Sequence, residues 1–209
     1  MIRRYSWLLG AAGLLSLLSP AWAALLVSSN GSGSVERFDL ATGSWLGSFV
    51  PAGSGGLISP DGMAFGPDGN LYVSNERASS VLRYDGRTGA SLGTFVPSGS
   101  GGMDIAEVPT FGPDGNLYVS STHAHTVLRY DGRTGAFLDV FVPARSGGLN
   151  GPYGLGFGPD GTLYVVSISS AQVLRYRGSD GAFLGALVTG LPLVFPTYLV
   201  FTPNPAGCL

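Results

Sequence analysis

The chain has 209 residues, of which 44% are hydrophobic and only 11% are charged, whereas roughly a quarter of an ordinary globular domain is charged. Enough apolar surface is present to offset the entropy of the chain, which excludes a disordered protein despite 34 glycines and 14 prolines. The formal net charge of −2 argues against a nucleic-acid-binding protein, because such proteins carry a basic surface.

The first 23 residues have the order of an export signal. Arg3 and Arg4 precede an apolar stretch over 7–18, and small residues follow at Ala21 and Ala23. A retained membrane anchor is the alternative, but this stretch is shorter than the ~20 residues that a span needs. The sequence therefore predicts a signal peptide over 1–23, a mature domain over 24–209 without a transmembrane segment, and a secreted or periplasmic location.

The mature chain is built from a repeat of 46 residues. The decapeptide Phe-Gly-Pro-Asp-Gly-Asn-Leu-Tyr-Val-Ser starts at Phe65, returns at Phe111 and returns in altered form at Phe157. A second block, Val-Leu-Arg-Tyr-Asp-Gly-Arg-Thr-Gly-Ala, starts at Val81 and is unchanged at Val127. Related copies at 35–44 and 173–182 bring the number of repeats to four, which fill the domain.

Each repeat contains four short apolar runs separated by turn residues. In one repeat these runs cover 108–111, 117–120, 127–130 and 137–142. The intervening Gly-Pro-Asp-Gly and Asp-Gly-Arg-Thr-Gly segments are typical of tight hairpin turns. No stretch of useful length has a helical period of 3.6 residues. The repeat is thus expected to be a four-stranded antiparallel unit.

Tandem four-stranded units of this length predict an all-β fold, a β-propeller of four 46-residue blades. The chain opens at Leu25 with the second run of a repeat and later supplies a first run at 198–201. We therefore expect the N- and C-terminal strands to complete one shared blade. Because four blades would each require a large rotation, an unclosed arc and a ring completed by two chains remain open as alternatives.

The repeats resemble NHL-type propeller repeats, in which an apolar strand, an Asp-Gly turn and an aliphatic-Tyr-Val strand precede a second hairpin. The resemblance covers residues 25 to about 203 and implies the propeller fold. It implies little about activity, because such propellers carry unrelated functions.

The two sets of loops are expected to differ in role. The turns with Pro-Asp-Gly and Arg-Thr-Gly share one end of the propeller and are almost invariant between repeats, which indicates a structural role. Variation is concentrated at the opposite end, as expected where a rigid scaffold carries differentiated loops. There we predict a ligand-binding face that comprises Asn75, Glu76, Asp104, His123, His125, Asn150 and Tyr153.

The 46-residue alignment places Asp61, Glu107 and Tyr153 at equivalent positions near the propeller axis, with Thr197 supplied by the shortened last unit. Equivalent side chains of a ring converge, so Asp61 and Glu107 are expected to approach each other. Such oxygens suit Ca²⁺, which takes 6–8 oxygen ligands. Two close carboxylates could equally provide a general base with a raised pKa, and solvated loop acids are the third interpretation.

The segment Pro60-Asp61-Gly62-Met63, followed by an apolar strand and Gly-Pro-Asp-Gly, is similar to the repeat of the regucalcin and gluconolactonase propellers. In that family a central metal activates water against sugar lactones. The resemblance implies a metal ligand at Asp61. It departs from the family at Tyr153, which stands where an Asn would be wanted.

His123 and His125 form the only histidine pair of the sequence. Alternate residues of an extended segment can face one metal, with Glu76 or Glu107 as a third ligand. An exposed polar hairpin tip is the other interpretation.

Together these patterns predict an exported propeller that binds a carbohydrate or a protein without catalysis and requires no cofactor. It would be a monomer or a ring-completing dimer. The alternative is a metal-dependent lactonase or esterase with a central Ca²⁺ bound by Asp61 and Glu107.

Overall fold

A computed structural model describes residues 24–189 and 193–202. The segment predicted as a signal peptide lies outside the described residues, as does Cys208, the only cysteine. Within the described ranges the chain forms 15 strands and four 3₁₀ turns of three residues each. No helix in that part of the chain is long and apolar enough to span a membrane. The all-β prediction is confirmed.

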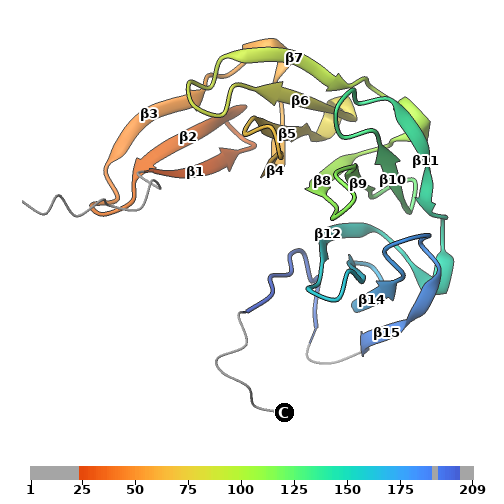
Figure 1. The fold of residues 1–209 in the computed structure, drawn as a ribbon. Coiled ribbons are helices and arrows are strands. Elements are labelled where there is room, and N and C mark those ends of the chain that lie inside the picture. Colours follow the sequence, from red (N-terminus) through yellow and green to blue (C-terminus); the bar gives the residue numbers. More distant parts are fainter. Residues whose placement is uncertain (1–23, 190–192, 203–209) are drawn as a thin grey trace, which may run out of the picture.

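The strands form four antiparallel sheets in chain order, which we call blades 1 to 4 (Figure 1). Blade 1 has three strands: β1 (Ala24–Ser29), β2 (Ser34–Asp39) and β3 (Trp45–Val50). Blade 2 has four: β4 (Pro60–Phe65), β5 (Leu71–Asn75), β6 (Ser80–Tyr84) and β7 (Ser91–Val96). Blade 3 has β8 (Ala106–Phe111), β9 (Leu117–Ser121), β10 (Thr126–Tyr130) and β11 (Phe137–Val142). Blade 4 has β12 (Pro152–Phe157), β13 (Leu163–Ser167), β14 (Gln172–Tyr176) and β15 (Phe183–Thr189).

The four 3₁₀ turns lie in connections between strands. They are η1 (Ser54–Gly56), η2 (Glu76–Ala78), η3 (Ser100–Gly102) and η4 (Ser146–Gly148). Three of them repeat the sequence Ser-Gly-Gly between successive blades.

Aspartates organise both kinds of hairpin turn. Asp68 accepts hydrogen bonds from the backbone and side chain of Asn70 and from the hydroxyl of Tyr72, which fixes the first hairpin of blade 2. In the second hairpin Asp85 accepts from the backbone of Arg87 and from Thr88. These local bonds close the turns that separate the apolar runs.

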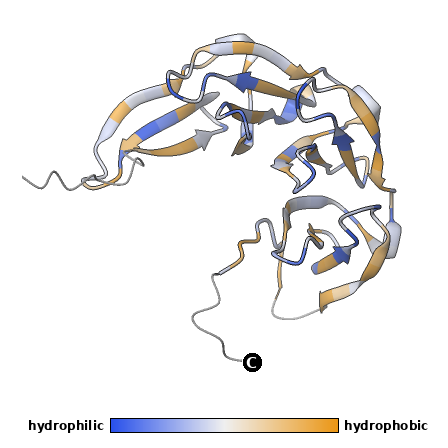
Figure 2. Ribbon diagram, in the orientation of Figure 1, coloured by the Kyte–Doolittle hydropathy of each residue, from blue (hydrophilic) through white to orange (hydrophobic). Residues whose placement is uncertain are grey.

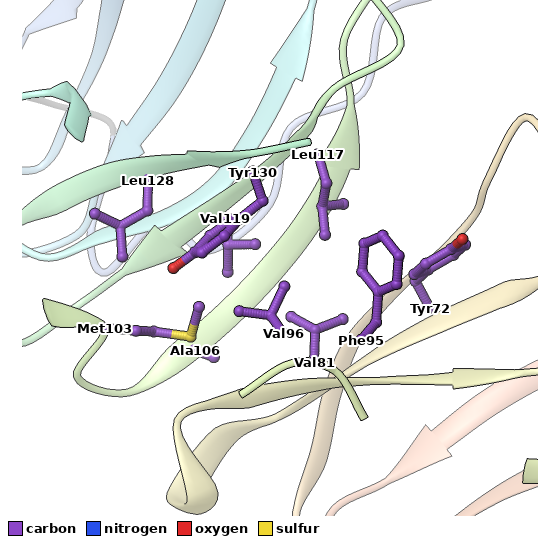
Figure 3. Packing of buried hydrophobic residues seen from close by; sticks show 10 residues of the cluster. All are labelled: Tyr72, Val81, Phe95, Val96, Met103, Ala106, Leu117, Val119, Leu128 and Tyr130. Carbon is purple, nitrogen blue, oxygen red and sulfur yellow. The ribbon is translucent and has the colours of Figure 1, made fainter. Parts of the chain in front are cut away.

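The hydrophobic core lies between successive blades. Each blade turns two rows of alternating side chains toward its two neighbours, so that both faces of an inner blade are covered. The cluster between blades 2 and 3 is shown in Figure 3 and comprises Tyr72, Val81, Phe95, Val96, Met103, Ala106, Leu117, Val119, Leu128 and Tyr130. Equivalent clusters separate blades 1 and 2 and blades 3 and 4.

The expected shared blade does not form. β1 pairs only with β2 among the described residues, and blade 1 has three strands. The segment 197–201 lies beside β12 instead, where the backbone N–H of Gly154 donates to the carbonyl of Thr197 at 2.7 Å. Figure 1 shows an open arc with blade 1 at one end and blade 4 at the other.

Packing between blades explains why the arc stays open. Large side chains fill each gap: the Tyr72 ring meets Phe95 and Phe111 edge to face, with ring centroids 4.8 and 4.9 Å apart. Tyr118 makes the same contacts one blade later. Because cores are close-packed, these rings set the angle between neighbouring blades. Four blades at this angle turn through only part of a circle, and the unclosed arc weighed from the sequence is what the structure shows.

Candidate functional site

The structure brings together side chains from three blades on the concave side of the arc. Asp61 lies in β4, Glu107 in β8 and Tyr153 in β12, at the same position of each first strand. The hydroxyl of Tyr153 donates a hydrogen bond of 2.9 Å to Oδ2 of Asp61, although 92 residues separate them. The side chain of Glu107 lies close enough to Asp61 for Asp61 to raise its pKa. The predicted convergence of Asp61 and Glu107 is therefore observed.

Glu107 is buried, with 4% of its surface exposed. Burial, followed by the hydrogen bond and the negative charge of Asp61, raises the pKa of Glu107 to about 9. Two ionised carboxylates could only accept hydrogen bonds, and Oε2 of Glu107 has no hydrogen-bond partner among the described residues. With its pKa raised to about 9, Glu107 holds its proton at neutral pH, and this proton supplies a donor on the side of Asp61.

Two tyrosines flank this pair. The rings of Tyr153 and Tyr198 meet at 5.9 Å between centroids, with planes inclined by 71°. Burial, together with the nearby negative charge of Glu107, raises the pKa of the Tyr153 hydroxyl. Burial also raises the pKa of Tyr198 to about 12, with Asp61 and Glu107 as further causes. Both hydroxyls are therefore neutral and able to donate hydrogen bonds.

Backbone contacts hold the first strands of blades 2 and 3 close together. The hydroxyl of Ser74 in β5 bonds to the carbonyls of both Gly62 and Glu107. A side chain at Gly62 would collide with the carbonyl of Glu107 and the backbone of Val108. Glycine at this position permits the close approach that places Asp61 beside Glu107.

The residues of this cluster do not fit a calcium site. Ca²⁺ takes 6–8 oxygen ligands, whereas the cluster offers two carboxyl groups, one of which already accepts a hydrogen bond from Tyr153. In the described ranges, no three His, Cys, Asp or Glu side chains are grouped so that they could hold a metal ion. We therefore derive no chemical step through a metal.

Asn75 is buried, and its side chain holds a loop of its own blade. Its carbonyl oxygen accepts hydrogen bonds from the backbone N–H groups of Ile58 and Ser59, both at 3.1 Å, and its amide donates to the carbonyl of Gly56 at 3.0 Å. The next residue, Glu76, is half-buried and accepts a hydrogen bond of 2.6 Å from Asn30. Neither side chain joins the axial pair directly, although the charge of Glu76 contributes to the raised pKa of Glu107.

The two histidines make different contacts. His123 is exposed, and its Nδ1 lies 3.9 Å from a carboxylate oxygen of the equally exposed Asp104. His125 instead accepts a hydrogen bond of 3.0 Å from the backbone N–H of Gly151, through its Nδ1. Asn150, the residue before, is half-buried and its backbone is held by Ser167. The two histidines therefore contact different residues, Asp104 and Gly151.

The contact of His125 repeats in another blade. Ser79, its equivalent in blade 2, accepts a hydrogen bond of 2.9 Å from the backbone of Ile105, which is the equivalent of Gly151. Both residues have positive φ, at 47° and 58°. This repetition favours a structural role for His125, in which one blade holds the loop of the next.

Tyr198 was not singled out from the sequence. It enters the cluster because the segment 197–201 packs on β12, whereas the sequence predicted that this segment would pair with β1. The signal that could have identified it is its position, one residue after Thr197, the equivalent of Asp61, Glu107 and Tyr153.

The sheets, the cores between them and the axial cluster define a β-propeller-type fold, present as an open arc. Solved structures with the same fold include a protein provisionally classed as a gluconolactonase, with a TM-score of 0.69 and 22% identity over 87% of this chain and 64% of the other. Virginiamycin B lyase from Staphylococcus aureus has a TM-score of 0.62 and 18% identity over 87% of this chain and 61% of the other. Hydrazine synthase from Kuenenia stuttgartiensis has a TM-score of 0.62 and 22% identity over 78% of this chain and 45% of the other.

At these identities the likeness shows the fold alone. This chain spans less than two thirds of the length of each of these three proteins. No protein-family model matches the chain, and no curated protein matches it. The membership in the NHL-type repeats that the sequence indicated stays a prediction.

Proposed function

We propose that this protein binds a carbohydrate at the axial cluster without catalysing its conversion. The observation that carries the proposal is the network of Asp61, Glu107 and Tyr153 on the concave side of the arc. The Asp61 side chain can accept hydrogen bonds from sugar hydroxyls, and the neutral phenol of Tyr198, which is 57% exposed, can donate to sugar oxygens. The cluster therefore offers both kinds of partner to a polyhydroxylated ligand.

The aromatic side chains support the same ligand class. The Tyr198 residue is more than half exposed beside the cluster, and its ring is inclined to that of Tyr153. An exposed ring next to fixed polar groups gives an apolar surface for the C–H face of a sugar, while the polar groups orient its hydroxyls. A protein partner with a flat surface would reach Asp61 and Glu107 on the concave side less easily than a sugar would.

Calorimetric titration with a panel of neutral oligosaccharides tests the proposal. Asp61→Asn keeps the shape of the side chain and removes its charge, and we expect it to weaken binding at least about tenfold, the effect of losing a charge-assisted hydrogen bond. Asp160→Asn is the matched control, because Asp160 is exposed and lies in a hairpin turn of blade 4, outside the axial cluster and the predicted ligand-binding face. Equal affinity of Asp61→Asn and the unchanged protein would refute binding at the axial cluster.

A second function is favoured by the raised pKa of Glu107 beside Asp61. A neutral acid next to a carboxylate is an arrangement suited to general acid–base catalysis. For a lactone, Asp61 would take a proton from a water molecule as the oxygen of that water bonds to the carbonyl carbon of the lactone. Glu107 would then give its proton to the ring oxygen as the C–O bond breaks, and a hydroxy acid would result.

The likeness in fold to a protein classed as a gluconolactonase agrees with this second function. Hydrolysis of glucono-1,5-lactone, followed by acid release, separates the two functions. Turnover that is lost in both Asp61→Asn and Glu107→Gln but kept in Asp160→Asn would establish the hydrolase and overturn the non-catalytic proposal. Binding of oligosaccharide without turnover of any lactone would establish the reverse.

A further inference from the structure

The face of blade 1 that points away from blade 2 is exposed, although the repeat is built to bury it. Leu25 and Val27 of β1 are 50% and 41% exposed. Their equivalents in blade 2, Leu71 and Val73, are 1% and 0% exposed, and those in blades 3 and 4 are also buried. The same alternation of residues that covers the inner blades thus leaves an apolar face open at this end of the arc.

The opposite end of the arc shows the complementary feature. Leu187 in β15 is 55% exposed, whereas its equivalents Phe49, Phe95 and Phe141 are between 4% and 7% exposed. Those three side chains face the next blade in their clusters. Blade 4 therefore presents the face that normally receives a following blade. Figure 2 shows hydrophobic residues on β1 at one end of the arc and on the segment beside blade 4 at the other.

The segment 197–201 already occupies the place of the first strand of a following blade. The ring of Phe201 meets Tyr164 at 5.2 Å, as Phe111 meets Tyr72 and Phe157 meets Tyr118, both at 4.9 Å. A side chain at Gly154 would collide with Thr197, just as one at Gly62 would collide with Glu107. No strand pairs with the other edge of this segment among the described residues.

Blade 1 lacks the strand that this segment supplies. In blade 2 the first strand pairs with the second through Met63 opposite Val73 and Phe65 opposite Leu71. The repeat aligns Leu199 with Met63 and Val27 with Val73. A segment 197–201 placed on the open edge of β1 in the same register would set Leu199 opposite Val27 and Phe201 opposite Leu25.

Charges on the two end faces are also complementary. Glu36 takes the place of the buried Leu82, Leu128 and Leu174, on the open face of blade 1. Arg175 lies on the same strand position as Arg129, which stacks on Phe141 at the face toward the next blade. Opposite Arg175 the strand carries Gly185, where Arg129 has Asp139. Nε of Arg175, like Nε of Arg37 and Arg83, has no hydrogen-bond partner in the described part of the chain.

From these five observations we propose that a second copy of this chain docks head to tail on the first. Blade 4 and the segment 197–201 of one copy cover blade 1 of the other, and the segment adds a fourth strand to β1. The join buries Leu25, Val27 and Leu187 and brings Arg175 to the side of Glu36. Such a heterologous contact closes into a ring or continues as an open chain of copies, according to the angle between them.

A disulfide across the proposed strand pair tests the join. We place Val27→Cys and Leu199→Cys in one chain with Cys208→Ser, because opposite residues of an antiparallel pair lie within the reach of a disulfide. Mild oxidation should give covalent dimers or longer chains on a non-reducing gel. The control, Val27→Cys with Val200→Cys, shifts one partner to the other face of the strand and should crosslink far less. A crosslink formed within one chain, or equal yields in both variants, would overturn the proposal.

Light scattering on the unmodified chain gives an independent readout that needs no substitution in the join. A mass of at least two chains supports the docking, and a monomer at the highest soluble concentration overturns it. Glu36→Arg should weaken the assembly by placing two cations together. Combining it with Arg175→Glu should restore the assembly, a rescue that a purely structural effect of either change would not produce.

Discussion

Tyr153 in blade 4 donates a hydrogen bond to Asp61 in blade 2, across the blade that lies between them. This bond requires both blades to turn the same strand position toward one point. Glu107, from the intervening blade, lies at that point and contacts Asp61. The axial cluster therefore depends directly on the curvature of the arc.

Glu107 predicts a dependence of stability on pH. Its pKa is raised from 4.5 to about 9 in the folded chain, chiefly by burial. Between these two values the folded state holds more protons than the unfolded state, so the free energy of unfolding should fall as the pH rises. One such proton gives a slope of up to about 1.4 kcal/mol per pH unit. Thermal unfolding measured from pH 5 to pH 9 checks the sign.

Glu107→Gln should remove most of that slope, because an amide has no proton to lose in this range. Asp160→Asn is the matched control: hydrogen bonds from Thr162 lower the pKa of Asp160, so its contribution is lost only as the pH falls below the ordinary range of an aspartate. The slope above pH 5 should persist in that variant. An unchanged slope in Glu107→Gln would show that Glu107 is ionised when buried.

Tyr153→Phe should destabilise the chain by about 1–2 kcal/mol, because it removes a donor to a charged acceptor and leaves the ring contact with Tyr198 in place. Tyr198→Phe is the comparison, since its hydroxyl forms no hydrogen bond with any described residue. Urea unfolding of the two variants measures the difference. A larger loss in Tyr198→Phe would mean that the Tyr153 bond contributes little.

The repeat in the sequence was sufficient to predict the strands, because each turn depends on residues only a few positions apart. Asp68 and Asp85 bond to neighbours within four residues, and both motifs are visible in the printed sequence. Closure of the ring was not predictable in this way. It depends on the angle between blades, which is set by side chains such as Tyr72 and Phe95 that come together only in the fold.

The axial pair was predictable because equivalent positions of a repeat converge, but the role of other polar residues was not. Asn75 looked like a surface ligand, yet it is buried and occupied by its own loop. Its equivalents in the repeat indicate this role. Ser121 and Ser167 hold the same loop in blades 3 and 4 through hydrogen bonds to the backbone of Asp104 and Asn150. A small polar residue at the same strand end of every blade indicates a structural task. The binding role predicted for this loop face remains to be tested.

Asn75→Ala should therefore lower the free energy of unfolding by about 2 kcal/mol, since it leaves the buried N–H of Ser59, the part-buried N–H of Ile58 and the carbonyl of Gly56 without a partner. Asn75→Ser should lose less, because serine holds the equivalent loop in two other blades. Urea unfolding provides the comparison. If Asn75 served only to bind a ligand, both variants would be as stable as the unchanged chain.

Gly132 offers a test of the contact between the two hairpins of one blade. A side chain at Gly132 would collide with the carbonyl of Gly115 in the first hairpin, and Gly86 and Gly178 make the same approach in blades 2 and 4. Blade 1 has Leu40 at this position, and that side chain is exposed, since blade 1 has no first hairpin among the described residues. Gly132→Ala should therefore cost about 3 kcal/mol, measured by thermal unfolding. Gly31→Ala, where the added methyl group meets no atom within 4 Å, should cost far less. If the two variants lost equal stability, the close contact between the hairpins would contribute little to the rigidity of the blade.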